Sequence, residues 1–236
     1  VGVGWYRTEF DVPQFQAGKR ATILFDGAMS HANVYINGQK VGYWPYGYNS
    51  FYFDITKYLK PGEKNTLAVR LENLPESSRW YPGAGLYRNV HLIITEDAYI
   101  PVWGTYITTP SVNEKFAKVN VRTKVVLPEG ADPAKYSVET SVWNPNKQKL
   151  TAVRTSLAQM KYNNDLAEQE FVIQDPSLWS PEMPALYSAE TRLYEGDKLK
   201  DTYTTPFGIR SIEIIPDKGF FLNGKRTVFK GVCNHH

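Results

Sequence analysis

The last residues of the chain, KGVCNHH (230–236), gather side chains that can hold a metal ion or attack a substrate. A cysteine thiolate and a histidine imidazole are both zinc ligands, and a cysteine with a histidine as its base is also a nucleophilic pair. Three hypotheses follow for this stretch. It is a metal site, a catalytic thiol with its base, or one piece of a larger site that is cut off from the rest.

Strand geometry argues against the first two hypotheses. Successive side chains on a strand point to opposite faces, so His235 and His236 would diverge and could not share one ion. Cys233 and His235 would share a face, but two ligands are too few for a closed zinc site. A thiol nucleophile also needs a third group that orients its base, and a strand cysteine is more often a small buried apolar residue. His31 and His91 are isolated in the sequence. We therefore predict no metal site and no cofactor.

Paired carboxylates are the next candidates for chemistry. Glycosidases usually act with two carboxyl groups, which lie about 5–5.5 Å apart in retaining enzymes. Glu96-Asp97 and Glu195-Gly196-Asp197 are the obvious pairs, but their sequence context is that of solvated turns. The chain has no phosphate-binding glycine loop and no Ser/His/Asp signature. The sequence thus predicts no catalytic residue within these positions.

The stretch SSRWYPGAGLYRNV (77–90) is the richest polar and aromatic segment, and it leads into a strand. Loops of this kind often carry function on a rigid scaffold. Its arginines could hold a carboxylate or a hydroxyl, and its tryptophan could stack on a sugar face. The alternative is an ordered loop whose aromatic side chains fill a domain interface. The residues alone favour the second explanation and leave the first open.

Composition narrows the class of protein. A length of 236 residues suits one large or two ordinary domains. Lys and Arg (27) barely exceed Asp and Glu (24) and are scattered, which argues against a nucleic-acid partner. No apolar run is long enough to span a bilayer, so no membrane partner is expected. The single cysteine rules out an internal disulfide and leaves the cellular compartment unknown.

Short strands between turn signals account for most of the chain. Helical periodicity is nearly absent, except that DITKYLKPG (54–62) can form one helical turn. Asn37-Gly38 and Asn223-Gly224 are strong hairpin signals because both residues tolerate a positive φ. In the first part the predicted strands are 6–12, 22–25, 33–36, 40–43, 67–71 and 90–94.

The pattern changes near Glu96–Ile100, after which a second series of strands begins. Seven short strands in a little over a hundred residues are typical of an immunoglobulin-like sandwich. They are predicted at 102–107, 117–127, 136–143, 150–157, 168–173, 186–194 and 199–203. The remaining residues, from Ile215 on, are too few to bury a core and must pack on a neighbour or belong to a domain that continues.

Taken together, these segments resemble glycoside hydrolase family 2, the family of bacterial β-galactosidases, β-glucuronidases and β-mannosidases. GVGWYRTEFDVP (2–13), NVYINGQKVG (33–42) and SRWYPGAGLYRNV (78–90) resemble its sugar-binding domain. LWSPEMPALY (178–187) and TTPFGIRSIE (204–213) resemble the end of its immunoglobulin-like domain, and GFFLNGKRTVFKGVCNHH (219–236) resembles the start of its (β/α)₈ barrel. The resemblance covers the whole chain in the family's order.

The resemblance implies an all-β fold: a jelly-roll β-sandwich (1–97), an immunoglobulin-like β-sandwich (98–214) and the hairpin and first strand of a truncated barrel (215–236). It implies retaining hydrolysis of β-glycosides by two barrel glutamates that lie beyond this chain, so this part alone is predicted to be inactive. It also implies a family segment before GVGWYR, whose absence would expose a strand edge.

Two residues are implied to face the substrate in the full-length enzyme. His235 matches a family histidine at the end of the first barrel strand, where barrel active sites form. Asn73 falls where some β-galactosidases place a first-domain carboxylate or amide. The predicted partner is a β-galactoside-type carbohydrate, and homo-oligomer contacts are possible. A free-standing carbohydrate-binding module, or a scaffolding pair of sandwiches without hydrolase activity, remains the alternative.

Overall fold

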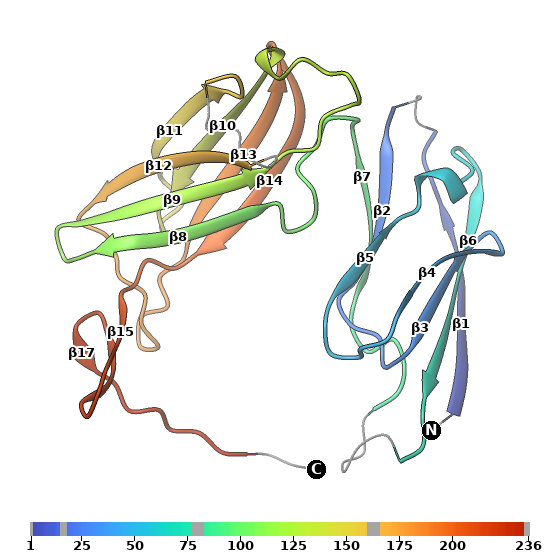
Figure 1. Ribbon diagram of the computed structural model, residues 1–236, viewed down its shortest axis with the longest axis horizontal. Helices are drawn as coiled ribbons and strands as arrows, with labels where there is room; N and C mark the ends of the chain where they lie inside the picture. The colour runs from blue at the N-terminus through green and yellow to red at the C-terminus, as the bar shows by residue number, and fades with distance from the viewer. Residues whose placement is uncertain (1, 15–17, 77–82, 160–165, 234–236) are drawn as a thin grey trace. The chain divides into compact units, whose positions relative to one another are not determined.

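A computed structural model describes residues 2–14, 18–76, 83–159 and 166–233, and it divides into two compact units (Figure 1). The first unit runs to Glu96 and the second begins at Asp97. Both are built almost wholly from β-strands, as the sequence predicts, and no helix in the described part of the chain is long and apolar enough to cross a membrane.

The first unit is a β-sandwich of a four-stranded and a three-stranded sheet, in the orders β1-β6-β3-β4 and β5-β2-β7. All the strand pairs in it are antiparallel. The elements are β1 (Gly2–Asp11), β2 (Arg20–Phe25), β3 (Ala32–Ile36), β4 (Gln39–Trp44), β5 (Phe51–Asp54), the 3₁₀ turn η1 (Thr56–Tyr58), β6 (Lys64–Asn73) and β7 (Val90–Thr95).

Alternation along the strands separates an inner face from an outer face in this unit. In β6, Leu67, Val69 and Leu71 are buried on the inner face, and of the two residues between them Arg70 is half-buried and the small Ala68 is buried. Phe25 of the facing sheet is fully buried and stacks on Phe51, with 4.9 Å between the ring centroids. Burial of these apolar side chains from both sheets is what holds the sandwich together.

The turn between β3 and β4 shows why the sequence signal was reliable. Asn37 and Gly38 have φ values of 50° and 81°, which is the conformation of the two central residues in a tight hairpin. The Asn37 side chain accepts a hydrogen bond from the Thr66 amide (2.9 Å) and donates to Asn65 Oδ1 (2.8 Å). The turn is therefore fixed both by its backbone preference and by its side chain.

The second unit is a sandwich of four plus three strands, in the orders β11-β10-β13-β14 and β12-β9-β8. This is the division of an immunoglobulin-like sandwich, and the predicted all-β fold class is confirmed. The elements are β8 (Thr105–Val112), β9 (Phe116–Lys124), the 3₁₀ turn η2 (Pro133–Lys135), β10 (Tyr136–Trp143), β11 (Lys149–Ser156), β12 (Leu166–Gln174), β13 (Tyr187–Glu195) and β14 (Lys198–Phe207).

A small hairpin sheet follows in the order β15-β16-β17, comprising β15 (Ile212–Ile215), β16 (Gly219–Leu222) and β17 (Lys225–Arg226). It is attached to the second unit through Asn223, whose side chain accepts from the Ser211 amide and donates to the Trp179 carbonyl, both at 3.0 Å. These contacts fit the first of the two expected alternatives, packing on a neighbour, and leave open the second, a domain that continues.

Several strand predictions differ from the structure. β1 begins at Gly2 rather than at Tyr6, β15 was not predicted, and three further differences have local physical reasons. The four-residue strand β5 was missed because four residues are too short to show a period, and only its last residue, Asp54, falls within the predicted helical turn. The strand predicted from Val102 begins only at Thr105, because the Gly104 amide donates to the Pro101 carbonyl at 2.8 Å and closes a turn. The barrel strand expected after the last hairpin has no counterpart in residues 228–233, because a strand needs a hydrogen-bonded neighbour and the backbone pairing among the described residues ends with the Thr227 amide, which donates to the Phe220 carbonyl at 2.9 Å.

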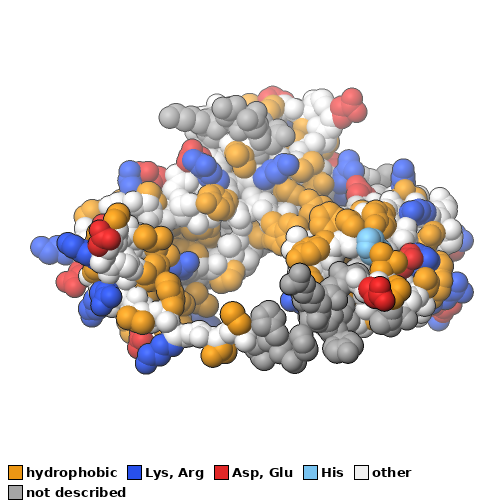
Figure 2. All heavy atoms as spheres, turned by 60° about the horizontal axis from the view of Figure 1, so that its bottom comes forward, with side chains coloured by type: hydrophobic (Ala, Val, Ile, Leu, Met, Phe, Trp, Pro, Cys, Tyr) orange, Lys and Arg blue, Asp and Glu red, His pale blue; other side chains and the backbone are white. Residues whose placement is uncertain are grey.

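The surface carries charges of both signs. Figure 2 shows basic and acidic side chains interspersed with hydrophobic ones over the visible face. Several aromatic side chains of the first unit are well exposed, among them Trp5 at 58% and Tyr43 at 47%. Trp103 and Tyr106 of the second unit are exposed to a similar extent, at 57% and 63%, so exposure alone does not identify a binding surface.

Candidate functional site

The predicted site residue Asn73 is the last residue of β6, where it pairs with Gly2 of β1. Alternation places it on the inner face, in line with Leu71 and Val69, and only 4% of it is exposed. A polar amide at the end of an apolar row is costly unless its groups are hydrogen-bonded. Asn73 is therefore a buried polar residue at the end of β6, next to the loop that leads toward β7.

Three segments are tied together beside Asn73. Glu72 and Ser30 exchange two hydrogen bonds, from the Glu72 amide to the Ser30 carbonyl (2.9 Å) and from Ser30 Oγ to the Glu72 carbonyl (3.0 Å). Met29 and Gly85 form an isolated antiparallel bridge with N···O distances of 3.0 and 3.1 Å. The β2–β3 connection, the end of β6 and the loop before β7 thus form one end of the unit.

Gly85 fits this bridge because of its backbone. Its φ of +119° is strained for any residue with a side chain, and an added Cβ would lie 2.5 Å from the Tyr6 hydroxyl. The glycine therefore allows the loop to pass close to the edge strand. Of the polar and aromatic loop singled out in the sequence, residues 77–82 lie outside the described part, and Gly85 and Tyr87 are its clearest structural contributions.

Exposed tyrosines surround this end of the unit. Tyr46 and Tyr48 meet edge to face with ring centroids 5.5 Å apart, and they are 53% and 42% exposed. Tyr87 donates to the Gly47 carbonyl at 2.8 Å, which joins the β4–β5 connection to the loop before β7, and Arg88 lies over its ring at 5.0 Å. Such rings can stack on the apolar face of a sugar while their hydroxyls bind its polar edge.

The other predicted site residue, His235, lies outside the described residues. Cys233, close to it in the chain, is exposed and has no disulfide partner. No group of three or more metal-ligating side chains occurs among the residues that the structure describes. The role of His235 therefore stays a prediction, and the described residues around Asn73 include no metal centre.

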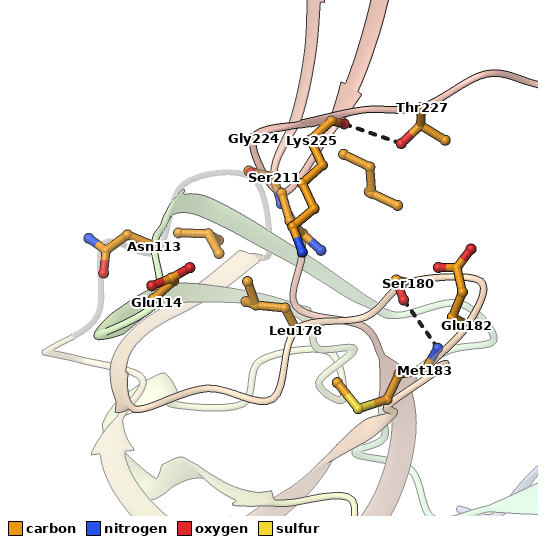
Figure 3. Close-up of a pocket in the computed structure, with 13 residues that line it drawn as sticks. Asn113, Glu114, Leu178, Ser180, Glu182, Met183, Ser211, Gly224, Lys225 and Thr227 are labelled. Atoms are coloured by element: carbon orange, nitrogen blue, oxygen red, sulfur yellow. Dashed lines mark hydrogen bonds between the residues drawn. The ribbon is translucent and has the colours of Figure 1, made fainter.

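The second unit has a cavity of about 520 Å³ between the sandwich and the last hairpin (Figure 3). Lys225 of β17 points into it, with Glu114 on one side of the view and Ser180 and Glu182 on the other. The wall is braced by a hydrogen bond from the Met183 amide to Ser180 Oγ (3.1 Å). Carboxylates, an ammonium group and hydroxyls line this space, but nothing arranges two carboxylates for acid–base catalysis.

Asp97, Lys200 and Asp201 of the second unit have shifted pKa values, and their contacts anchor the start of the unit rather than form a site. Hydrogen bonding to Lys200 lowers the pKa of Asp97, and hydrogen bonding to Asp97 raises the pKa of Lys200. Burial raises the pKa of Asp201, whose carboxylate accepts from the Ile100 amide at 2.8 Å. These contacts hold residues 97–100 against β14.

Two protein-family descriptions match this chain, one over each unit. The family description "Glycosyl hydrolases family 2, sugar binding domain" matches residues 1–96, and "Glycosyl hydrolases family 2" matches residues 99–210. The chain belongs to glycosyl hydrolase family 2. The first unit corresponds to the sugar-binding domain, so its aromatic end and Asn73 lie in a domain type named for carbohydrate binding.

Characterised family 2 proteins are similar over the whole chain. Beta-galactosidase BoGH2A of Bacteroides ovatus is 41% identical over 236 residues, which are 100% of this chain and 28% of that protein. The beta-glucuronidase of Bacteroides fragilis is 35% identical over 99% of this chain and 35% of its own length. The chain thus spans about a quarter to a third of these relatives.

Solved structures of family 2 proteins are also similar to this chain over nearly its whole length. A glycosyl hydrolase family 2 member from Bacteroides cellulosilyticus matches with a TM-score of 0.89 and 34% identity over 100% of this chain and 32% of that one. A Bacteroides uniformis beta-glucuronidase matches with a TM-score of 0.83 and 30% identity, over 99% of this chain and 29% of the other. The family 2 resemblance proposed from the sequence is confirmed.

Two features of the first unit were missed by the sequence analysis. The tyrosine pair at 46 and 48 was not singled out, although YGY between two strands is a detectable signal for an exposed aromatic turn. The row of Trp5 and Tyr43 across the outer sheet face was also missed, because it depends on the pairing of four strands, which no local pattern reveals.

Proposed function

We propose that this chain is the non-catalytic N-terminal part of a retaining β-glycosidase whose substrates are terminal β-galactosides. The observation that carries the proposal is the match to Beta-galactosidase BoGH2A along the entire chain, at 41% identity and over 28% of that protein. In this proposal the two catalytic glutamates belong to the barrel that the family resemblance implies.

The first unit has the role of shaping one wall of the sugar pocket. Asn73 supports this role because its amide lies buried at the end of β6 beside the glycine-containing loop, and exposed tyrosines surround that end. Because the Asn73 side chain is already buried, it loses little conformational entropy when it binds a sugar hydroxyl. His235 completes the proposed pocket from the barrel side, at the end of the first barrel strand.

Kinetics of the whole protein encoded by the gene test the role of Asn73. Replacing it with alanine (Asn73→Ala) removes a hydrogen bond to the substrate, and we expect kcat/KM for a nitrophenyl β-galactoside to fall by about tenfold. Asn120→Ala is the matched control, because that amide donates to Glu168 at 2.7 Å on the second unit and has no proposed contact with substrate. An unchanged kcat/KM in Asn73→Ala, with folding intact, would remove Asn73 from the pocket.

A second candidate is hydrolysis of β-glucuronides. It is favoured by relatives named beta-glucuronidase, one of them 35% identical over 99% of this chain. The ratio of kcat/KM for the nitrophenyl β-galactoside to that for the β-glucuronide discriminates between the two candidates. A ratio above one supports the galactosidase, and a ratio far below one replaces it with the glucuronidase.

A further inference from the structure

Strands β1, β6, β3 and β4 form one sheet of the first unit (Figure 1). The outer face of this sheet carries a row of side chains that the proposed function does not use. Strand pairing aligns Trp5 with Arg70, Arg70 with Asn33, and Asn33 with Tyr43. Directly paired residues share a face of a sheet, so these four side chains form one line across it. Asn73 lies on the opposite, inner face of the same sheet.

The dimensions of this row suit an extended ligand. Neighbouring strands lie about 4.8 Å apart, so Trp5 on β1 and Tyr43 on β4 are separated by three strand spacings, or roughly 14 Å. Their side chains are 58% and 47% exposed, whereas Arg70 and Asn33 between them are half-buried. The row therefore presents two open aromatic rings with polar groups between them.

Each member of the row is already held in place. Trp5 packs on Tyr35 with ring centroids 5.6 Å apart, and Arg70 is paired with Glu72 at 3.0 Å. The Tyr43 hydroxyl is hydrogen-bonded to His31 Nδ1 at 2.6 Å. A preorganised surface loses little side-chain entropy when it binds, which favours recognition rather than accidental exposure.

Positive charge accompanies the aromatic rings. The next row on the same face contains Arg7, Ala68, Tyr35 and Lys40, because Arg7 pairs with Ala68, and Tyr35 pairs with both Ala68 and Lys40. Both cations are exposed, and neither has a salt bridge to another described residue. Arg70 is neutralised by Glu72, so Arg7 and Lys40 leave a net positive charge beside the Trp5–Tyr43 row.

We propose that this outer face binds an acidic glycan chain, with Trp5 and Tyr43 stacking on sugar rings and Arg7 and Lys40 pairing with its carboxylates. Aromatic side chains recognise the apolar faces of sugars, and the unpaired cations select a chain that carries negative charge. Arg70, Asn33 and Glu72 supply the hydrogen bonds to hydroxyls between the two rings. The site would hold a polysaccharide on the surface of the sugar-binding domain, beyond the pocket role proposed for Asn73.

Calorimetric titration of the chain with a galacturonate oligomer, and with a neutral galactose oligomer of equal length, tests the proposal. We expect the acidic oligomer to bind at least about tenfold more tightly than the neutral one, and its affinity to fall as salt is raised. Trp5→Ala is expected to weaken binding about tenfold or more, and Trp5→Tyr to restore most of it, because the ring is retained. Arg7→Gln with Lys40→Gln is expected to remove the preference for the acidic oligomer.

Two matched variants serve as controls. Trp103→Ala removes a tryptophan of similar exposure (57%) from the second unit, and Lys60→Gln removes an exposed cation that is not on this face. Both should bind the acidic oligomer as the unchanged protein does, and circular dichroism checks that every variant is folded. Equal affinity for both oligomers, unchanged binding by Trp5→Ala, or no binding of either oligomer at millimolar concentration would overturn the proposal. Self-association of the chain that Trp5→Ala abolishes would also overturn it, because the face would then be an interface between copies.

Discussion

Lys200 holds the start of the second unit, and its replacement by methionine (Lys200→Met) should lower stability measurably. Its side chain is only 7% exposed and its ammonium group contacts Asp97 at 2.8 Å and Glu195 at 3.5 Å. The two carboxylates are 40% and 42% exposed, so water can hydrate them once the ammonium group is gone. Methionine keeps most of the buried hydrocarbon stem, which isolates the effect of the charge.

The loss of stability expected for Lys200→Met lies between two limits. Removing one partner of a fully buried ion pair costs about 3–5 kcal/mol, and a fully exposed pair contributes about 0–1 kcal/mol. Because one partner is buried and the other two are well hydrated, we expect Lys200→Met to reduce the free energy of unfolding by about 2 kcal/mol. For a unit of this size that is a fall of roughly 6 °C in Tm.

The pH dependence of this difference follows from the pKa shifts. The hydrogen bond to Lys200 holds the pKa of Asp97 below 3.8. The stability that this pair contributes is therefore present above pH 3.8 and is lost as the pH falls through the folded-state pKa of Asp97. The same contact raises the pKa of Lys200 above 10.5. The stability that the pair contributes is therefore present below pH 10.5 and is lost as the pH rises through the folded-state pKa of Lys200. The difference between the two proteins should therefore be largest between these limits.

Scanning calorimetry at several pH values is the assay. Lys198→Met is the matched control, because Lys198 is exposed on the same strand and has no salt bridge to another described residue. We expect Lys198→Met to leave Tm nearly unchanged. A Lys200→Met protein as stable as the Lys198→Met control at pH 7, or a difference that persists undiminished near pH 2, would refute the electrostatic explanation.

Two further substitutions probe the first unit. Gly85→Ala is expected to lower the free energy of unfolding by about 1–3 kcal/mol because of the φ of +119°, and adding Tyr6→Phe should recover little of this loss, since the exposed Tyr6 ring can move aside. Urea unfolding of both variants measures the loss. Nearly complete recovery in the double variant would show instead that the clash with the Tyr6 hydroxyl dominates. Phe25→Ala is expected to lower the free energy of unfolding by about 3–5 kcal/mol, because the ring is fully buried and stacks on Phe51. Calorimetry should show this loss in the unfolding transition of the first unit. A loss below about 1 kcal/mol would mean that this core is loosely packed.

Much of the fold was predictable because its signals are local. Hairpins at Asn37-Gly38 and Asn223-Gly224 have the positive φ values that those residue pairs favour, and strands such as β6 show their alternation directly in the sequence. β5 was missed because four residues are too short to show a period. The late start of β8 was also missed, since it depends on one backbone hydrogen bond between Gly104 and Pro101.

The functional surfaces were less predictable, because they are assembled from residues far apart in the chain. Asn73 was found through family resemblance, and strand alternation then placed it at the end of an apolar inner row. The outer row joins Trp5 to Tyr43 through two intervening strands, so it becomes visible only once the order β1-β6-β3-β4 is known. His235 lies outside the described residues, and its proposed role rests on the resemblance alone.

The central claim is that this chain is the non-catalytic part of a β-glycosidase. Release of nitrophenol from a nitrophenyl β-galactoside tests it most directly, when the purified 236-residue chain and the whole protein encoded by the gene are compared at equal concentration. The account predicts turnover by the whole protein and none above background by the folded chain. Turnover by the chain itself, or no glycosidase activity in the whole protein, would contradict it.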